Sequence, residues 1–571
     1  MFVINDALYS IRSNFVNITI FYLPLKMKKF IRHIISHLLL PAGLCLSTNH
    51  TLAFEPGIPF KINHVLQVNE KIHNDFKISP DAKRVVYRVA NSGLFSVPVL
   101  GGAVTNLTTS IPDQEGRVVD FKITPDSSKV IYILDTPDGH NLRAVDINGG
   151  FSRSISLVRE NSNDQKIVRY LMSPDSSSVV YLVDEDRLGR NRLYRSTLKE
   201  PFSVGLRIGP ELTSNQSIEP DIRFIPNQNT VVYRANLNNS NRIDLYRTAI
   251  TTFSRPVQLN ASMVRGGNVQ LPPGALADSS AFSISNDGKY VVYHADQRIN
   301  GSYELYSATL TFPIRRNTLN PLSIDAAVDV FDHRISPDSK RVLYRANERF
   351  SHVKGRLINE LFSVSISGSR NPTRISDDQS INDAVFKYKF GPNSARVAYS
   401  GDPDNTGEIK LYSVLVNGGP ITTLTANIVN GGGVTSFDFS RFGAKVVYSA
   451  RQDLISVNEL FSIRPDGRDL IKLHRSLVPG ENVLMSGIAI DEINDRVLYR
   501  SDQSSVNVFE IFSSSIDDDS QVENVKLNLS FQNTRCFLLS SDKRYLVYLA
   551  NQIGGRQFEL YAVDLTGVDD A

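Results

Sequence analysis

The sequence has little of what marks several common protein classes. Its 571 residues include no tryptophan and only two cysteines, and its formal net charge is +3. That charge is too small and too evenly spread to indicate a nucleic-acid partner. One of the cysteines, Cys45, lies in a segment that we expect to be removed, so we expect no intrachain disulfide. We predict that the other, Cys536, is a small buried residue on an apolar strand.

The motifs of common enzyme chemistries are absent too. The chain has no Gly-x-Ser-x-Gly nucleophile motif, and its glycine pairs do not stand at a strand–helix junction, where they would bind phosphate. The histidines that follow residue 53 show no short ligand spacing: His64, His73, His140, His294, His333, His352 and His474. The acidic stretch at 402–408 fits a hairpin better than a calcium loop. We therefore predict no catalytic residue, no metal site and no cofactor.

The chain does contain ten copies of one sequence repeat. In each copy a turn such as Ser336-Pro337-Asp338 leads into an apolar strand that ends at a tyrosine, here Tyr344. The ten tyrosines are Tyr87, Tyr132, Tyr181, Tyr233, Tyr293, Tyr344, Tyr399, Tyr448, Tyr499 and Tyr548. The steps between them range from 45 residues (Tyr87 to Tyr132) to 60 residues (Tyr233 to Tyr293). A period of this size is typical of propellers and solenoids.

Each repeat contains four apolar stretches separated by turn residues, with no helical period. This pattern predicts an all-β fold, a β-propeller of about ten four-stranded blades. The last repeat stops after its third strand, and a strand-like piece at 59–65 precedes the first repeat. We therefore predict a single ring over residues 54–571, closed by the N-terminal strand, which completes the last blade and removes open sheet edges. Two smaller propellers with a boundary near residues 312–323 are the alternative.

The repeat resembles the WD40-like (PD40) repeats of TolB-type propellers. The resemblance rests on Ser-Pro-Asp, then Val-x-Tyr, then Glu-Leu-Phe or Glu-Leu-Tyr, as in Ser79-Pro80-Asp81 with Tyr87 and in Glu360-Leu361-Phe362. It covers residues 58–567 and implies an exported bacterial propeller. Periplasmic binding proteins, peptidases and lyases use such repeats, so the resemblance implies the fold more strongly than the function. The small α/β domain that TolB carries ahead of its propeller has no counterpart here.

Residues 1–53 resemble a secretory signal. Starting from Met27, which is a possible true start, Lys28, Lys29 and Arg32 precede an apolar run that is too short to span a membrane. The segment ends in Thr51-Leu52-Ala53, whose small residues suit cleavage before Phe54. We expect a periplasmic or secreted protein with no transmembrane span after signal cleavage.

Two features vary between repeats and are therefore candidates for function. The residues 12 and 10 positions before the tyrosine carry opposite charges in four repeats: Asp75 and Lys77, Asp120 and Lys122, Asp221 and Arg223, and Asp332 and Arg334. Alternate residues share one face of a strand, so these eight are candidates for lining the central channel. They would hold the blades together as interblade ion pairs, or receive a peptide or small anion. The second feature is a long insert, Ala261–Asp278.

These observations predict an exported, non-enzymatic propeller scaffold that binds a protein or peptide partner in the cell envelope. The alternative is a secreted propeller enzyme, a polysaccharide lyase or hydrolase, whose site at a channel mouth draws residues from several inner strands.

Overall fold

The computed structural model describes residues 57–566 except 110–115, 157–164, 186–187, 200–203, 214, 239–241, 252–254, 321–328, 352–355, 377–384, 405, 426–427, 518–524, 530–531 and 552–556. By its internal contacts the chain divides into two units, Met1–Ala53 and Phe54–Ala571. The expected signal segment lies outside the described residues. The described residues form 41 strands. They include no helix that is long and apolar enough to cross a membrane.

The strands of the described residues form ten antiparallel sheets, which we number blades 1 to 10 in chain order. The first strands are β2 (Lys77–Ile78), β6 (Arg117–Ile123), β10 (Lys166–Met172), β15 (Arg223–Phe224), β19 (Phe282–Ile284), β23 (Val330–Ile335), β27 (Val385–Phe390), β31 (Gly433–Phe439), β35 (Val483–Asp491) and β39 (Thr534–Leu539). The second strands are β3 (Arg84–Val89), β7 (Lys129–Thr136), β11 (Ser178–Asp184), β16 (Thr230–Asn236), β20 (Tyr290–Ala295), β24 (Arg341–Ser351), β28 (Arg396–Gly401), β32 (Val446–Arg451), β36 (Arg496–Ser501) and β40 (Tyr545–Asn551).

The third strands are β4 (Gly93–Pro98), β8 (Gly139–Asp146), β12 (Asn191–Thr197), β17 (Asp244–Ala249), β21 (Glu304–Thr309), β25 (Arg356–Ser365), β29 (Lys410–Leu415), β33 (Glu459–Ile463), β37 (Glu510–Ser515) and β41 (Phe558–Asp564). The fourth strands are β5 (Thr105–Asn106), β9 (Arg153–Ser154), β13 (Leu206–Arg207), β18 (Val257–Gln258), β22 (Arg316–Thr318), β26 (Thr373–Arg374), β30 (Thr422–Thr423), β34 (Ile471–Lys472), β38 (Val525–Lys526) and, in blade 10, β1 (Phe60–Lys61). Blade 4 has one more strand, β14 (Ser217–Ile218).

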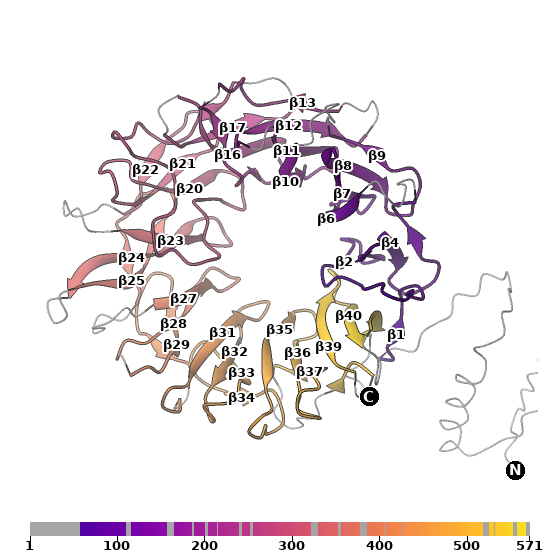
Figure 1. Ribbon diagram of the computed structural model, residues 1–571. Helices are drawn as coiled ribbons and strands as arrows, with labels where there is room; N and C mark the ends of the chain where they lie inside the picture. The colour runs from indigo at the N-terminus through magenta and orange to yellow at the C-terminus, as the bar shows by residue number, and fades with distance from the viewer. Residues whose placement is uncertain are drawn as a thin grey trace, which may run out of the picture. The chain divides into compact units, whose positions relative to one another are not determined.

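The blades form a single ten-bladed propeller, as predicted (Figure 1). In Figure 1 the labelled first strands, such as β6, β10, β31 and β35, lie nearest the centre of the ring. The alternative of two smaller propellers is excluded, because the hydrophobic cores run on from blade to blade. Across the boundary considered near 312–323, Leu305 and Leu319 of blade 5 pack in one cluster with Val330 and Val342 of blade 6.

The N-terminal strand closes the ring, as predicted. Phe60 and Lys61 of β1 pair with Ala562 and Tyr561 of β41. The Ile62 N–H donates to the Leu560 carbonyl at 2.9 Å. The same bond recurs in every other blade, for example from Ile375 to Leu361.

Side-chain contacts also show that β1 takes the place of a fourth strand. Lys61 forms an ion pair with Glu559, and in blade 8 Lys472 of the fourth strand pairs in the same way with Glu459 (2.6 Å). Asn63 accepts a hydrogen bond from the Leu560 N–H at 2.8 Å. A segment from the start of the chain therefore makes the contacts that a hairpin partner makes elsewhere.

The repeated motif builds the blade and joins it to the next one. The tyrosine is buried and, in every blade but blade 2, stacks on an aromatic residue of the third strand, as Tyr344 does on Phe362 with ring centroids 5.2 Å apart. In blade 2 the partner of Tyr132 is Arg143. In the turn, the Ser79 hydroxyl donates to the Asp81 carboxylate at 2.6 Å. The Asp81 N–H donates to the hydroxyl of Ser127 in blade 2 at 3.0 Å. The turn aspartate is thus a structural residue, as its position after proline indicates.

Two local departures have simple causes. The first strand of blade 4 is split into β14 and β15, and Pro220, which has no N–H to donate, stands between them. Cys536 is half-buried rather than buried as predicted. It lies on β39, an innermost strand, and packs only partly against the core shared by blades 10 and 1.

Candidate functional site

The eight charged residues lie on or next to the first strands, but the acids have other partners than the neighbouring blades. The aspartate 12 positions before the tyrosine binds an arginine one position after it, in the same blade. The N–O distances are 2.8 Å for Asp75–Arg88, 2.8 Å for Asp221–Arg234 and 2.7 Å for Asp332–Arg345. The expectation of interblade ion pairs is therefore wrong for these three acids. The antiparallel register sets Asp332 opposite Arg345, so the acid is neutralised within its own blade.

Tyrosines of the following blade also contact these acids. The Tyr388 hydroxyl donates to the Asp332 carboxylate at 2.5 Å. Burial raises the pKa of Tyr388, and the charge of Asp332 raises it further, so the hydroxyl remains a donor. Asp120 has Ile133 rather than arginine as its register partner. Its carboxylate adds to the effect of burial in raising the pKa of Tyr170.

The four bases bridge to the next blade through aromatic rings. Each cation lies over the ring that stands 11 positions before the next blade's tyrosine. The distances from the charged group to the ring centroid are 5.1 Å for Lys77 over Phe121, 4.3 Å for Lys122 over Tyr170, 5.6 Å for Arg223 over Phe282 and 5.8 Å for Arg334 over Tyr388. Such contacts contribute about 0.5–1 kcal/mol each at exposed sites. The bases therefore link neighbouring blades, without forming ion pairs with the acids of their own strands.

This arrangement leaves positive charge on the first strands. Within the described ranges, Lys77, Lys122 and Arg223 have no carboxylate within ion-pair distance, and Arg334 binds Asp278 of the insert. Burial lowers the pKa of Lys122, an effect that the nearby Asp120 opposes. A charge pair between blades does occur further round the ring, where Lys389 of blade 7 binds Asp438 of blade 8 at 2.7 Å.

Two adjoining cavities lie beside the first strands of blades 4 to 6. The larger, of about 350 Å³, is lined by Arg169, Asp221, Ile222, Arg223, Arg234, Gln270, Leu271, Ser279, Ser280 and Ala281. The smaller, of about 150 Å³, is lined by Arg223, Leu276, Asp278, Ser279, Ser280, Ser283, Asp332, His333, Arg334 and Tyr388. Both contain residues of the charged strands and of the 261–278 insert, so the two features that vary between repeats meet here. The larger volume falls at the lower end of the range of small-molecule sites.

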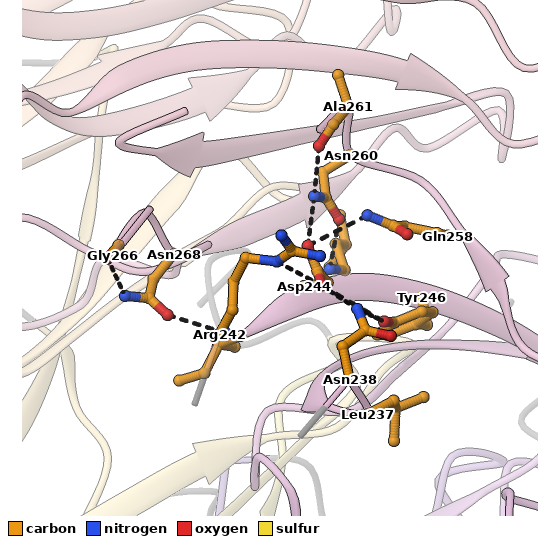
Figure 2. A network of polar contacts seen from close by, with 12 residues as sticks. Leu237, Asn238, Arg242, Asp244, Tyr246, Gln258, Asn260, Ala261, Gly266 and Asn268 are labelled. Carbon is orange, nitrogen blue, oxygen red and sulfur yellow. Dashed lines mark hydrogen bonds and ion pairs between the residues drawn. The ribbon is translucent and has the colours of Figure 1, made fainter. Parts of the chain in front are cut away.

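A buried polar network fixes the start of the insert (Figure 2). Asp244, which is fully buried, accepts hydrogen bonds from Asn260 (2.8 Å), Gln258 (3.1 Å) and Arg242 (3.0 Å). Asn260 also donates to the carbonyl of Ala261, the first residue of the insert, at 2.9 Å. Because every partner bonds the same buried carboxylate, the insert leaves blade 4 in one direction.

The insert then crosses from blade 4 to blades 5 and 6. The Val269 carbonyl accepts from Arg234 of blade 4 at 2.8 Å, and Gln270 donates to the Tyr303 hydroxyl at 2.6 Å. Leu276 packs against the core that blades 6 and 7 share. The Asp278 carboxylate binds Arg334 of blade 6. These contacts hold the insert in place beside both cavities.

Sequence reasoning missed two buried histidines that lie side by side. His294 Nε2 and His333 Nδ1 are 2.7 Å apart, and the Nε2 of His333 is buried without a hydrogen-bond partner. Burial lowers the pKa of His294 to about 3, and it lowers that of His333 as well, with Arg223 and Arg334 adding to the effect. Both rings are therefore neutral near pH 7.

A signal for this pair was present in the aligned repeats. His294 follows Tyr293 at the place where blades 1, 4, 6 and 9 have arginine, and His333 stands 11 positions before Tyr344, where seven other blades have Phe or Tyr. Across the described residues no group of three or more His, Cys, Asp and Glu side chains is arranged as metal ligands. In the acidic stretch at 402–408, the Asp402 carboxylate accepts the N–H groups of Thr406 (3.1 Å) and Gly407 (2.9 Å), as in a hairpin turn.

Comparison with known proteins assigns no family. No protein-family model matches the sequence, and no curated protein matches it. Similar solved structures include TolB from Acinetobacter baumannii, at 16% identity and a TM-score of 0.25, covering 70% of this chain and 78% of that one. Dipeptidyl peptidase 4 from Porphyromonas gingivalis has 11% identity and a TM-score of 0.43, with 77% and 65% covered. An oligogalacturonate lyase in complex with manganese has 13% identity and a TM-score of 0.32, with 60% and 88% covered. These likenesses assign no activity to this chain.

Proposed function

We propose that the protein is an exported, non-enzymatic propeller scaffold in the cell envelope, and that it binds an acidic segment of a protein or peptide partner along its inner strands. The observation that carries the proposal is the charge left on those strands. Among the residues that the structure describes, Lys77, Lys122 and Arg223 have aromatic and neutral partners but no carboxylate within ion-pair distance. A carboxylate-rich segment supplies the missing countercharges without disturbing Asp75, Asp221 and Asp332, which are already bound to arginines.

The orientation of these cations favours binding over a purely structural role. The aromatic ring below each cation fixes its position before a ligand arrives, which lowers the entropic cost of binding. Three partly exposed ion pairs, to Lys77, Lys122 and Arg223, at about 0.2–1 kcal/mol each give roughly 0.6–3 kcal/mol in total, and this contribution weakens with salt.

The experiment compares two variants with the same change in net charge. The first carries Lys77→Gln, Lys122→Gln, Arg223→Gln and Arg334→Gln. The control carries Lys83→Gln, Lys289→Gln, Lys340→Gln and Arg468→Gln, whose side chains are about three-quarters exposed. Binding of a fluorescent glutamate-rich peptide is measured for each at several salt concentrations.

We expect the inner-strand variant to bind the peptide about 3- to 150-fold more weakly than the wild type, and the control to bind like the wild type. Equal affinity in all three proteins contradicts the proposal. Export and envelope location are tested separately, by fractionating cells that express the full chain.

One observation favours a second function, a propeller enzyme acting on a polysaccharide. His333, Asp332 and Arg334 line the same cavity, which is the kind of cluster an active site needs. Against it, Asp332 and His333 are 2% and 7% exposed and are bonded to other buried groups. Release of reducing ends from polysaccharides by the wild type, abolished by Arg334→Gln, is the result that favours the enzyme.

A further inference from the structure

The larger cavity, beside blade 4, differs from the rest of the inner surface in carrying two unpaired arginines. Arg169 lies on β10 of blade 3 and Arg223 on β15 of blade 4, and both line the cavity. In the described part of the chain, neither arginine has a carboxylate within ion-pair distance. The third arginine of the cavity, Arg234, binds Asp221 at 2.8 Å.

The charge of this cavity selects the ligand. Three arginines and one aspartate give its lining a net of two positive charges. We propose that the cavity binds a small dianion, a dicarboxylate or a phosphomonoester, between Arg169 and Arg223. A cation is repelled by this lining, whereas a dianion can accept charge-assisted hydrogen bonds from both exposed guanidinium groups.

Arg223 is held in place for this task. Its Nη2 donates to the Ser280 hydroxyl at 2.9 Å, and that hydroxyl donates to the Phe282 carbonyl at 2.8 Å. The guanidinium also lies 5.6 Å from the centroid of the Phe282 ring. Contacts on two sides fix the plane of the guanidinium, so its remaining N–H groups are available in a fixed fork that suits carboxylate or phosphate.

The 261–278 insert and the two serines after it complete the site. Gln270 and Leu271 come from the insert, and Ser279 and Ser280 add hydroxyl groups. A cavity of about 350 Å³ equals roughly a dozen water volumes, which suits a molecule of roughly ten to fifteen non-hydrogen atoms. A folded domain is too large for it. Since the insert is fixed by Asp244 at one end and by Arg334 at the other, the cavity is preformed.

The site shares Arg223 with the proposed partner surface, so the test relies on Arg169 for the cavity and on Lys77 and Lys122 for the surface. Succinate, glycerol 3-phosphate and, as a monoanion, acetate are titrated into the full chain by calorimetry at low ionic strength. The variants are Arg169→Gln, Arg223→Gln and, as a matched control, Lys387→Gln. Lys387 is a cation on the first strand of blade 7 that donates to the Thr435 carbonyl and does not line the cavity.

We expect one of the two dianions to bind the wild type with at least about tenfold higher affinity than acetate. Arg169→Gln and Arg223→Gln should each weaken that binding about tenfold or more, and Lys387→Gln should leave it unchanged. Preference for succinate or for glycerol 3-phosphate identifies the anionic group. Failure of both dianions to bind the wild type, or an equal loss in Lys387→Gln, overturns the inference. Lys77→Gln with Lys122→Gln should weaken peptide binding alone, so the two proposals can fail separately.

Discussion

The closure of the ring is tested by truncating one side chain, Ile62→Ala. Ile62 is 3% exposed and packs in a core that contains residues of both blade 1 and blade 10. Removing it should cost about 2–3 kcal/mol, from lost burial and the cavity left behind. The strand keeps, among other contacts, its short ladder, the ion pair of Lys61 with Glu559, the backbone bonds of Gly57 and Ile62, and the hydrogen bond of Asn63. We therefore expect the N-terminal strand to detach while the rest of the ring stays folded.

Hydrogen exchange followed by mass spectrometry measures this. In Ile62→Ala, amide protection in the peptide Phe558–Asp564 should fall about 30- to 150-fold, which is the free energy above expressed as an equilibrium constant. The matched control is Ile375→Ala, at the same place in blade 6 and also buried (2% exposed). There the strand belongs to a continuous hairpin, so protection in Phe558–Asp564 should not change. If Ile62→Ala lowers protection equally in all blades, or not at all in blade 10, the reasoning about closure is wrong.

Two further predictions concern buried charge. Asp332→Asn leaves Arg345, which is 6% exposed, without its countercharge and should lower the free energy of unfolding by about 3–5 kcal/mol. Asp75→Asn, at the same place in blade 1 but 36% exposed, should lower it by less than about 1 kcal/mol; equal losses in denaturant titrations contradict this. In the folded protein the pKa of each histidine of the pair lies below the ordinary 6.5. The unfolded chain therefore binds more protons, and the free energy of unfolding falls as the pH drops from about 6.5 toward about 3. His294→Leu with His333→Phe should make the denaturation midpoint less sensitive to pH between 7 and 5, and an unchanged slope excludes the pair as the cause.

The fold was readable from the sequence because the repeat encodes it locally. The tyrosine, the Ser-Pro-Asp turn and the four apolar stretches recur in each copy, and Phe60-Lys61-Ile62-Asn63 has the same arrangement as the fourth strands inside the chain. The end of the last repeat after its third strand left one place for that segment. The single ring and its closure then followed from the need to pair both sheet edges.

The candidate site was readable only in part, because its contacts join residues from different blades. The charged residues were found by their spacing, but the partner of Asp332 is set by the register of two strands, and the partner of Arg334 by the path of the insert. Arg169 stands 12 positions before Tyr181, where the four charged repeats have aspartate, so the acid–base pattern does not include it. Its place beside Arg223 depends on how neighbouring blades pack, which local sequence does not specify.

The pairing of Lys61 with Glu559 also sets the order in which the protein can fold. The two residues are 498 positions apart in the sequence, so the ring can close only at the end. Hairpins within the other blades can form as soon as their strands leave the ribosome or a translocation pore. The first strand to emerge must remain without its partner until nearly the whole chain has followed, and loop-closure entropy opposes that last step. Until then β1 lacks its partner β41, so conditions that delay the last repeat should favour aggregation or pairing between two chains.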